Sequence, residues 1–170
     1  MPSPIKIYKI DLSPPSRAAM MMAELLKLNF VTQNVDLMAG EHKSPEYVAK
    51  NPMHTVPLLE DGDFLLADSH AIILYLVTKY GGGQQSKLYP SCVKLRATVH
   101  QRLFFETSNV AELNDAYEIM EKYLQKTKYV ACDHLTLADV SCVANWYEKG
   151  NLFGLNKMKE FLNSIGVQTV

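Results

Sequence analysis

Hydrophobic and polar positions along the first third of the chain change period several times, which predicts strands and helices in turn. Apolar residues at positions 5, 7, 8 and 10 predict a short buried strand, followed by a turn over Asp11–Pro15. Apolar residues at 18, 22, 25 and 26 then recur at helical spacing. A second strand is predicted over 30–37, with Val31, Val35 and Leu37 on one side. The order so far is strand, helix, strand.

The next stretch predicts a short helix, a hairpin and a longer helix. Residues 39–50 form a polar loop, in which Ser44 and Pro45 begin a short helix. Strands are predicted over 56–60 and 64–67, with Asp61-Gly62 as a strong hairpin signal. Pro57 suits the start of an edge strand, because proline has no N–H for a sheet ladder. Asp68 and Ser69 precede a helix over 71–80 as N-cap residues.

Strand patterns stop after a glycine-rich stretch, and this predicts a second domain of a different kind. Residues 81–86 read GGGQQS and suit a linker. Helical spacing then recurs around 93–104, 113–124, 136–147 and 158–165. At the third of these helices, Thr136 and Asp139 have the spacing of a capping box. The predicted fold is an α/β domain over 1–82 followed by an all-helical domain over 83–170.

The composition of the chain limits which binding partners and which cellular compartment are expected. Seventeen basic and eighteen acidic residues give a formal charge of −1, which favours neither nucleic acid nor an anionic membrane surface. The sequence has no apolar run long enough to span a bilayer and no signal-peptide pattern. Three cysteines without a CxxC pair fit free thiols in the cytoplasm. His42, His54 and His70 match no metal-site spacing, so no metal is expected.

Two predicted helix starts are the candidate chemical sites. Ser13 precedes the first long helix, and Asp68 and Ser69 precede the helix over 71–80. A helix start offers unpaired N–H groups and about half a positive charge, so it can hold a carboxylate or stabilise a thiolate. Plain capping is the alternative reading for both, and the physics of the residues alone favours it.

A family resemblance rests on long ordered motifs of the chain. The segments DLSPPSRA, LMAGEHKSPEYVAKNPMHTVPLLEDGDFLLADSHAIILYLVTKYG, LYP and KYVACDHLTLADVSCVA resemble a cytosolic glutathione transferase of the insect epsilon class, with the delta class next. The match covers residues 4 to 106 and resumes from about 113 to 145. It implies a thioredoxin-like domain that binds glutathione as co-substrate, without a cofactor, and a helical domain that shapes the pocket for a small hydrophobic electrophile.

The resemblance also implies roles for particular residues. Ser13 matches the catalytic serine, whose hydroxyl donates to the glutathione sulfur and favours the thiolate for conjugation or peroxide reduction. Pro57 matches a cis-proline that presents the backbone of Val56 to the cysteinyl part of glutathione, like one added strand. The expected glutathione-binding residues are His42, His54, Thr55, Val56, Pro57, Asp68, Ser69 and His70.

The chain departs from the family pattern at several places. Asp68 stands in place of a glutamate, and Cys132 replaces a glycine whose backbone conformation a side chain could strain. After Glu106 the tip of a helix hairpin is missing, and the region after Trp146 is short. We therefore expect an intact glutathione half and a trimmed electrophile half.

These departures leave a second function class open beside the enzyme. The alternative is a non-catalytic glutathione-binding or interaction protein that lost its electrophile-site helices. A dithiol redox module is disfavoured, because position 13 is serine and no CxxC lies at the helix start. The resemblance further implies a homodimer, for which the interface candidates are Tyr75, Lys79, Arg96 and His100.

Overall fold

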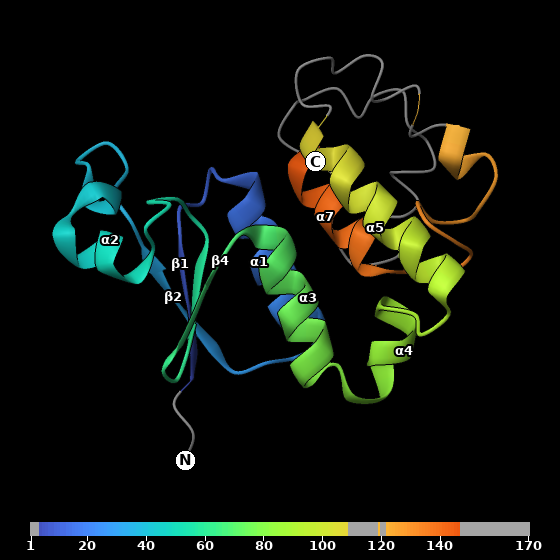
Figure 1. The fold of residues 1–170 in the computed structure, drawn as a ribbon, viewed down its shortest axis with the longest axis horizontal. Coiled ribbons are helices and arrows are strands. Elements are labelled where there is room, and N and C mark those ends of the chain that lie inside the picture. The colour runs from blue at the N-terminus through green and yellow to red at the C-terminus, as the bar shows by residue number, and fades with distance from the viewer. Residues whose placement is uncertain (1–3, 109–118, 120–121, 147–170) are drawn as a thin grey trace. The chain divides into compact units, whose positions relative to one another are not determined.

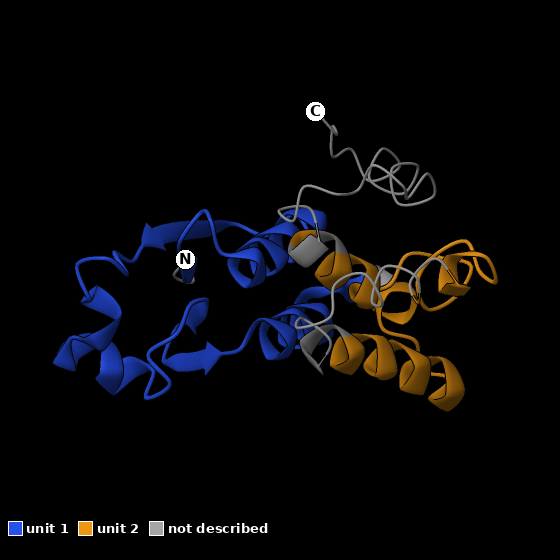
Figure 2. Cartoon of the chain, turned by 90° about the horizontal axis from the view of Figure 1, so that it is seen from above, with its two compact units in different colours: residues 1–82 blue, residues 83–170 orange. Residues whose placement is uncertain are grey.

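The computed structural model describes residues 4–108, 119 and 122–146 (Figure 1). The chain divides into two compact units, Met1–Gly82 and Gly83–Val170 (Figure 2). Unit 1 contains strands and helices, whereas the elements described in unit 2 are all helical.

Unit 1 is built on a four-stranded mixed sheet with the order β2-β1-β3-β4. The strands are β1 (Ile5–Lys9), β2 (Phe30–Asn34), β3 (Leu58–Asp61) and β4 (Phe64–Ala67). β1 pairs in parallel with β2, while β3 is antiparallel to both β1 and β4. The predicted order of strands is confirmed, with a parallel crossover followed by an antiparallel hairpin.

Two helices cover one face of this sheet (Figure 1). They are α1 (Pro14–Leu25) and α3 (Ser69–Tyr80), which pack against each other. Side chains alternate along a strand, so Ile7 and Leu59 can enter the core on this side while their neighbours face the other side. The largest fully buried side chains of the unit are Ile7, Met22, Leu58, Leu59, Ile72, Ile73 and Leu76.

The opposite face carries the helix α2 (Pro45–Lys50) and a second apolar cluster. This cluster consists of Tyr8, Val35, Tyr47 and Leu58, and each of these residues is at most 5% exposed. Ser44 caps α2, because its side chain accepts a hydrogen bond from the N–H of Tyr47 at 3.2 Å. The predicted helix start at Ser44-Pro45 is therefore confirmed.

Two strand predictions need correction. β3 is an interior strand, so the prediction that Pro57 begins an edge strand is wrong, although the strand does begin directly after Pro57. The missing N–H of Pro57 costs no ladder bond, because the ladder starts at Leu58. β2 is an edge strand that ends at Asn34, so it is shorter than the predicted strand over 30–37. Val31 within the strand is 42% exposed, whereas Val35 directly after it is buried.

Two turns also differ in detail from the prediction. Asp61 still pairs with Phe64, so the hairpin turn consists of Gly62 and Asp63 rather than Asp61-Gly62. Gly62 has a φ of +67°, a backbone conformation that residues with a side chain rarely adopt. The predicted linker is helical, since it contains a 3₁₀ turn over Gly82–Gln84 and the short helix α4 (Gln85–Leu88).

Unit 2 contains the longer helices α5 (Val93–Ser108) and α7 (Leu137–Trp146), which pack against each other. Val99 and Leu103 of α5 are buried, as are Leu137 and Val140 of α7. The shortened hairpin after Glu106 and the helix expected over 158–165 fall largely or wholly outside the described residues.

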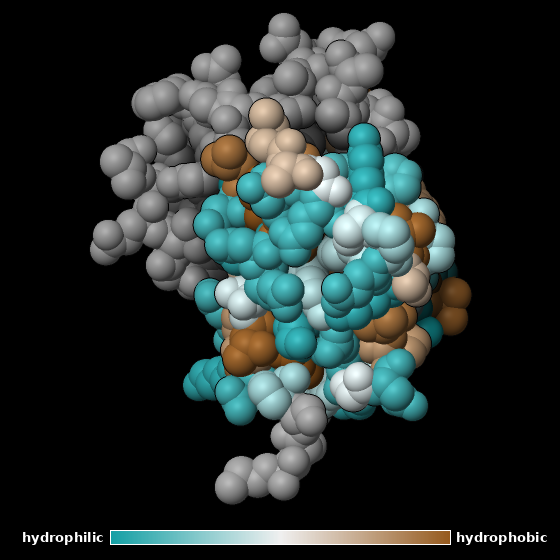
Figure 3. All heavy atoms as spheres, turned by 90° about the vertical axis from the view of Figure 1, so that its left-hand side faces the viewer, coloured by the Kyte–Doolittle hydropathy of each residue, from teal (hydrophilic) through white to brown (hydrophobic). Residues whose placement is uncertain are grey.

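Large exposed hydrophobic side chains are scattered over the surface. On the face that carries α2, hydrophobic residues form small patches among hydrophilic ones (Figure 3). Isolated exposures of this kind are normal for a folded protein. Among the described residues, none of the helices has the length and apolar character that a bilayer crossing needs.

Candidate active site

The topology of unit 1 brings three loops to the same end of the sheet, and each loop connects to the helix or strand that follows it. β1 terminates at this end and leads to Ser13, while the antiparallel β3 begins there after Val56 and Pro57. β4 runs back to the same end and leads to Asp68, since Leu58 pairs with both Tyr8 and Ala67. The predicted candidates Ser13, Val56 and Asp68 therefore lie at the same end of the sheet.

Ser13 is the N-cap of α1, and its hydroxyl oxygen accepts a hydrogen bond from the N–H of Ser16 at 3.3 Å. Pro14 and Pro15 have no N–H, and the N–H of Arg17 donates to the carbonyl of Ser13 at 3.1 Å. The first backbone donors of α1 are thus absent or already paired. The hydroxyl hydrogen of Ser13 is the donor that this helix start can still offer a ligand.

Ser16, the other hydroxyl at this helix start, is placed differently. Its side chain is fully buried, and its Oγ has no hydrogen-bond partner among the described residues. Ser13 is only half-buried and can be approached by a small molecule. The structure therefore favours Ser13 over Ser16 as the hydroxyl that meets a ligand.

The segment before β3 leaves one peptide group unpaired. The Val56–Pro57 bond is cis, as the family resemblance predicts. The N–H and C=O of Val56 form no hydrogen bond with other residues of the described part of the chain. The carbonyl of Thr55, by contrast, accepts from the hydroxyl of Tyr47 at 2.7 Å. A ligand backbone could therefore pair with Val56 in the manner of an added strand.

Two histidines lie next to each other beside this segment. The ring centroids of His42 and His54 are 6.3 Å apart. The Nδ1 atom of His42 is buried and has no partner among the described residues. His54 is exposed and has a φ of +46°, a left-handed conformation that is uncommon for a residue with a side chain. The pair offers imidazole nitrogens to an anionic group.

The start of α3 is shaped by Asp68, whose carboxylate Oδ1 accepts the N–H of Ala71 at 2.9 Å. Asp68 has a φ of +75°, a sparsely populated conformation that costs about 1–3 kcal/mol and often marks a ligand site. Asp68 is thus confirmed as the N-cap, but Ser69 is already the first residue of the helix, which begins two residues before the predicted start at Ala71. Asp68 is exposed, so its second carboxylate oxygen faces solvent. Ser69 and His70 lie in the first turn of the helix.

Tyr47 and Asn51 hold the segment before Pro57, and neither residue is among the site candidates predicted from the sequence. The Nδ2 group of Asn51 donates to the carbonyl of Thr55 at 2.9 Å, beside the bond from Tyr47. The Asn51-Pro52 step is a turn signal that could have drawn attention to Asn51. No local signal marks Tyr47, because its contact spans eight residues.

Neither a metal site nor a disulfide contributes to this region. Within the described ranges, no three His, Cys, Asp or Glu side chains are grouped so as to hold a metal ion. Cys92, Cys132 and Cys142 are free thiols. Burial raises the pKa of the Cys132 thiol, and Cys132 is not among the residues with positive φ. The strain considered for cysteine at this position is therefore absent.

Comparisons with known proteins show the family of the chain and support its fold. Residues 12–79 match the family model described as the glutathione S-transferase N-terminal domain. Glutathione S-transferase 1 of Manduca sexta is 40% identical over 164 residues, covering 82% of this chain and 74% of that protein.

Solved structures agree with the sequence matches. A glutathione transferase homologue from Drosophila mojavensis with bound glutathione has a TM-score of 0.85 at 34% identity, covering 95% of this chain and 86% of that one. An epsilon-class glutathione S-transferase from the housefly Musca domestica has a TM-score of 0.85 at 35% identity, covering 94% and 86%. The predicted thioredoxin-like and helical fold class is therefore confirmed.

The four-stranded mixed sheet of unit 1 and the helical elements described in unit 2 define a thioredoxin-like domain that is followed in the chain by a helical one. This chain belongs to the glutathione S-transferase family, within the range of its insect delta and epsilon members.

Proposed function

We propose that this chain is a glutathione transferase that activates the glutathione thiol as a thiolate. The observation that carries this proposal is the geometry of Ser13, whose oxygen accepts from Ser16 while its hydrogen remains available. A free thiol has a pKa near 8.5, so only a few per cent is ionised at neutral pH. A hydroxyl that donates to sulfur stabilises the anion, and a pKa drop of about 2 units corresponds to roughly 2.7 kcal/mol.

Glutathione would lie at the end of the sheet where the three loops with Ser13, Val56 and Asp68 meet. The N–H and C=O of Val56 would pair with its cysteinyl part, next to the cis-proline Pro57. Asp68 would hold the γ-glutamyl amine, and the start of α3 at Ser69 and His70 would hold the adjacent carboxylate. His42 and His54 would meet the glycyl carboxylate, which gives the buried Nδ1 atom of His42 a partner.

The proposed reaction joins the glutathione sulfur to an electrophilic carbon. The thiol proton leaves to solvent, and the thiolate lone pair forms a new S–C bond while the carbon expels its leaving group with the bonding electrons. Ser13 stays hydrogen-bonded to the sulfur and forms no covalent bond with the substrate. The enzyme therefore contributes orientation and thiolate stabilisation.

The electrophile is proposed to be small and hydrophobic. Leu12, the neighbour of Ser13, is 76% exposed and would offer an apolar contact to such an electrophile. The relatives are named as transferases, and nothing in the described ranges favours the non-catalytic alternative.

The protein is further proposed to be a cytoplasmic homodimer. Free thiols at all three cysteines fit a reducing compartment. The interface candidates are already tied within their own units, since Tyr75 and Lys79 both donate to Asp61. Arg96 donates to the carbonyl of Pro90 at 2.9 Å, and His100 pairs with Tyr89 at 2.8 Å. These contacts would present the four side chains in fixed positions to a second copy.

A conjugation assay tests the proposed function. The purified chain is incubated with glutathione and an aryl halide, and the thioether product is identified by mass. A protein-dependent rate that saturates with glutathione supports the proposal. A rate equal to that in buffer at every glutathione concentration would contradict it.

A further inference from the structure

The segment between α2 and β3 folds around a single buried side chain. Asn51 is 1% exposed, and its Oδ1 accepts the N–H of Met53 at 3.0 Å while its carbonyl accepts the N–H of His54 at 2.8 Å. Its Nδ2 donates to the carbonyl of Thr55 at 2.9 Å. One residue thus holds three successive residues, and His54 takes its left-handed φ within this turn.

A second donor reaches the same carbonyl from α2. The hydroxyl of Tyr47 donates to the oxygen of Thr55 at 2.7 Å. This oxygen belongs to the peptide group whose N–H is that of Val56, and in a trans peptide the C=O and N–H point in opposite directions. Two donors on the oxygen therefore fix the direction in which the Val56 N–H points.

The ring of Tyr47 is itself held in place. It is 5% exposed, and its centroid lies 6.0 Å from that of Tyr8 in an edge-on arrangement. Burial is the main cause that raises the pKa of Tyr47 to about 12. The hydroxyl therefore keeps its proton at neutral pH and remains a donor to Thr55.

We propose that Tyr47 is a positioning residue for glutathione, because its hydroxyl holds the Thr55–Val56 peptide group in the orientation that pairs with the cysteinyl backbone. The inference rests on the proposed function, and it adds a residue that would not touch glutathione itself. Tyr47 acts through the peptide, so its loss should change the affinity for glutathione rather than the rate of the bound thiolate.

Tyr8 provides a matched control within the same apolar cluster. It is 3% exposed, and its hydroxyl donates to Glu60 at 2.7 Å and accepts from Lys50 at 2.9 Å. None of these contacts involves the segment 51–57. Tyr8→Phe and Tyr47→Phe each remove one buried phenol hydroxyl, but only Tyr47→Phe removes a bond to the Thr55 carbonyl.

The test compares the full-length wild type with both variants in two measurements. Calorimetry gives the Kd for glutathione, and amide hydrogen exchange follows the N–H groups of Met53 and His54 without ligand. We expect Tyr47→Phe to raise the Kd about fivefold, the equivalent of one hydrogen bond. The same variant should speed exchange at both amides, whereas Tyr8→Phe should change the Kd less than twofold. At saturating glutathione, kcat should be unchanged in Tyr47→Phe.

The outcomes separate this inference from the proposed function. If the wild type binds glutathione but both variants bind it equally well, or are equally weakened, the inference is overturned. Absence of binding by the wild type itself would overturn the proposed function and, with it, the role of Tyr47 in glutathione binding. Exchange that is faster at Met53 and His54 only in Tyr47→Phe, together with the weaker binding, would support the inference.

Discussion

In the helical unit, the carboxylate of Asp139 accepts a hydrogen bond from the N–H of Val130 at 2.7 Å. Its other oxygen accepts from the N–H and the hydroxyl of Thr136, each at 2.8 Å. Asp139 and Thr136 are fully buried, and burial raises the pKa of Asp139. The carboxylate therefore joins the start of α7 to the loop nine residues earlier in the chain.

Asp139→Ala is expected to destabilise the helical unit by about 3 kcal/mol, because it leaves buried donors without an acceptor. Asp133→Ala is the matched control, since the exposed Asp133 accepts one bond from the N–H of Lys128. That control should change the free energy of unfolding by less than about 1 kcal/mol. Urea unfolding checks both values, and equal effects of the two variants would argue against the role of Asp139.

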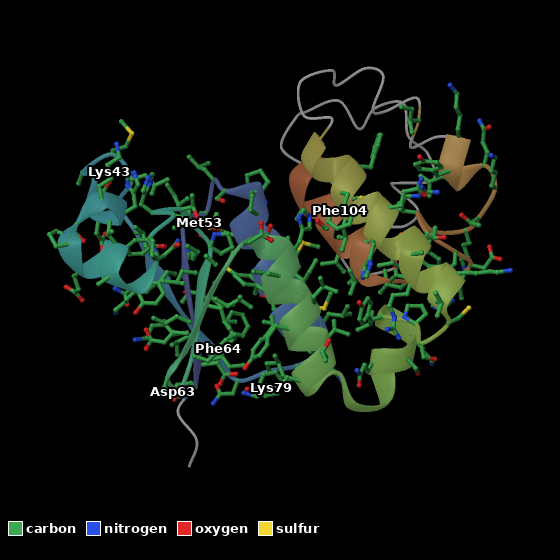
Figure 4. All side chains as sticks on the ribbon, in the orientation of Figure 1. Lys43, Met53, Asp63, Phe64, Lys79 and Phe104 are labelled. Atoms are coloured by element: carbon green, nitrogen blue, oxygen red, sulfur yellow. The ribbon has the colours of Figure 1, made fainter. Side chains whose placement is uncertain are left out.

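At the hairpin end of unit 1, one carboxylate oxygen of Asp61 accepts hydrogen bonds from three side chains. Tyr75 and Lys79 donate at 2.7 Å, and Tyr80 donates at 2.6 Å. Lys79 lies at the same end of the unit as Asp63 and Phe64 (Figure 4). Burial acts to raise the pKa of Asp61, but the hydrogen bonds from Lys79, Tyr80 and Tyr75 outweigh it and the pKa is lowered.

The sign of this shift predicts a pH window for stability. Because the pKa of Asp61 is lowered in the folded state, its contribution is present above its ordinary value of 3.8 and is lost as the pH falls through the folded value. The pKa values of Tyr75, Tyr80 and Lys79 are raised, by burial for the tyrosines and by Asp61 for the lysine. Their contribution is lost as the pH rises beyond about 10.

Asp61→Asn should therefore lower the urea midpoint at pH 7 and have a smaller effect at pH 3, which lies below the ordinary pKa of 3.8. Asp63→Asn, two residues further along in the hairpin turn, should leave the urea midpoint unchanged at both pH values. If Asp61→Asn lowers the urea midpoint equally at pH 3 and pH 7, the packing of the side chain rather than its charge explains the effect.

Asp68→Asn separates the two tasks proposed for Asp68. Asparagine retains an oxygen for the N–H of Ala71 and tolerates positive φ, so stability should change by less than about 0.5 kcal/mol. The negative charge for the γ-glutamyl amine is lost, so the Kd for glutathione should rise about tenfold or more. Calorimetry decides this, and an unchanged Kd would mean that Asp68 only caps α3.

Ser13→Ala at the N-cap of α1 and Ser16→Ala in the first turn of the helix form a matched pair. Loss of a hydrogen bond to an anion should lower kcat/KM of Ser13→Ala about 10- to 100-fold. Ser16→Ala removes a buried hydroxyl without a partner in the described part of the chain and should keep the wild-type value within about twofold. Steady-state kinetics checks both, and a larger loss in Ser16→Ala would reverse the assignment of the two serines.

The sequence was informative where local chemistry sets the structure. Ser13, Ser44 and Asp68 are helix caps that short-range signals predict, and the structure confirms each of them. The cis bond before Pro57 follows only from the family resemblance, because the base rate for such bonds is low.

Other features depend on contacts between distant segments and could not be read locally. The interior place of β3 requires its pairing with both β1 and β4, which the strand's own pattern does not encode. The bond from Tyr47 to Thr55 depends on how α2 packs against the sheet. The role of each glutathione-site residue remains a prediction, although Ser13, Val56 and Asp68 lie at the same end of the sheet.

The central claim is that Ser13 stabilises the thiolate of bound glutathione. The most direct test is the ultraviolet absorbance of the thiolate in the protein–glutathione complex, titrated with pH for wild type, Ser13→Ala and Ser16→Ala. We expect the thiol pKa to lie about 2 units below its free value in wild type and Ser16→Ala, and to return toward about 8.5 in Ser13→Ala. Saturable binding with an unshifted pKa in the wild type would contradict it.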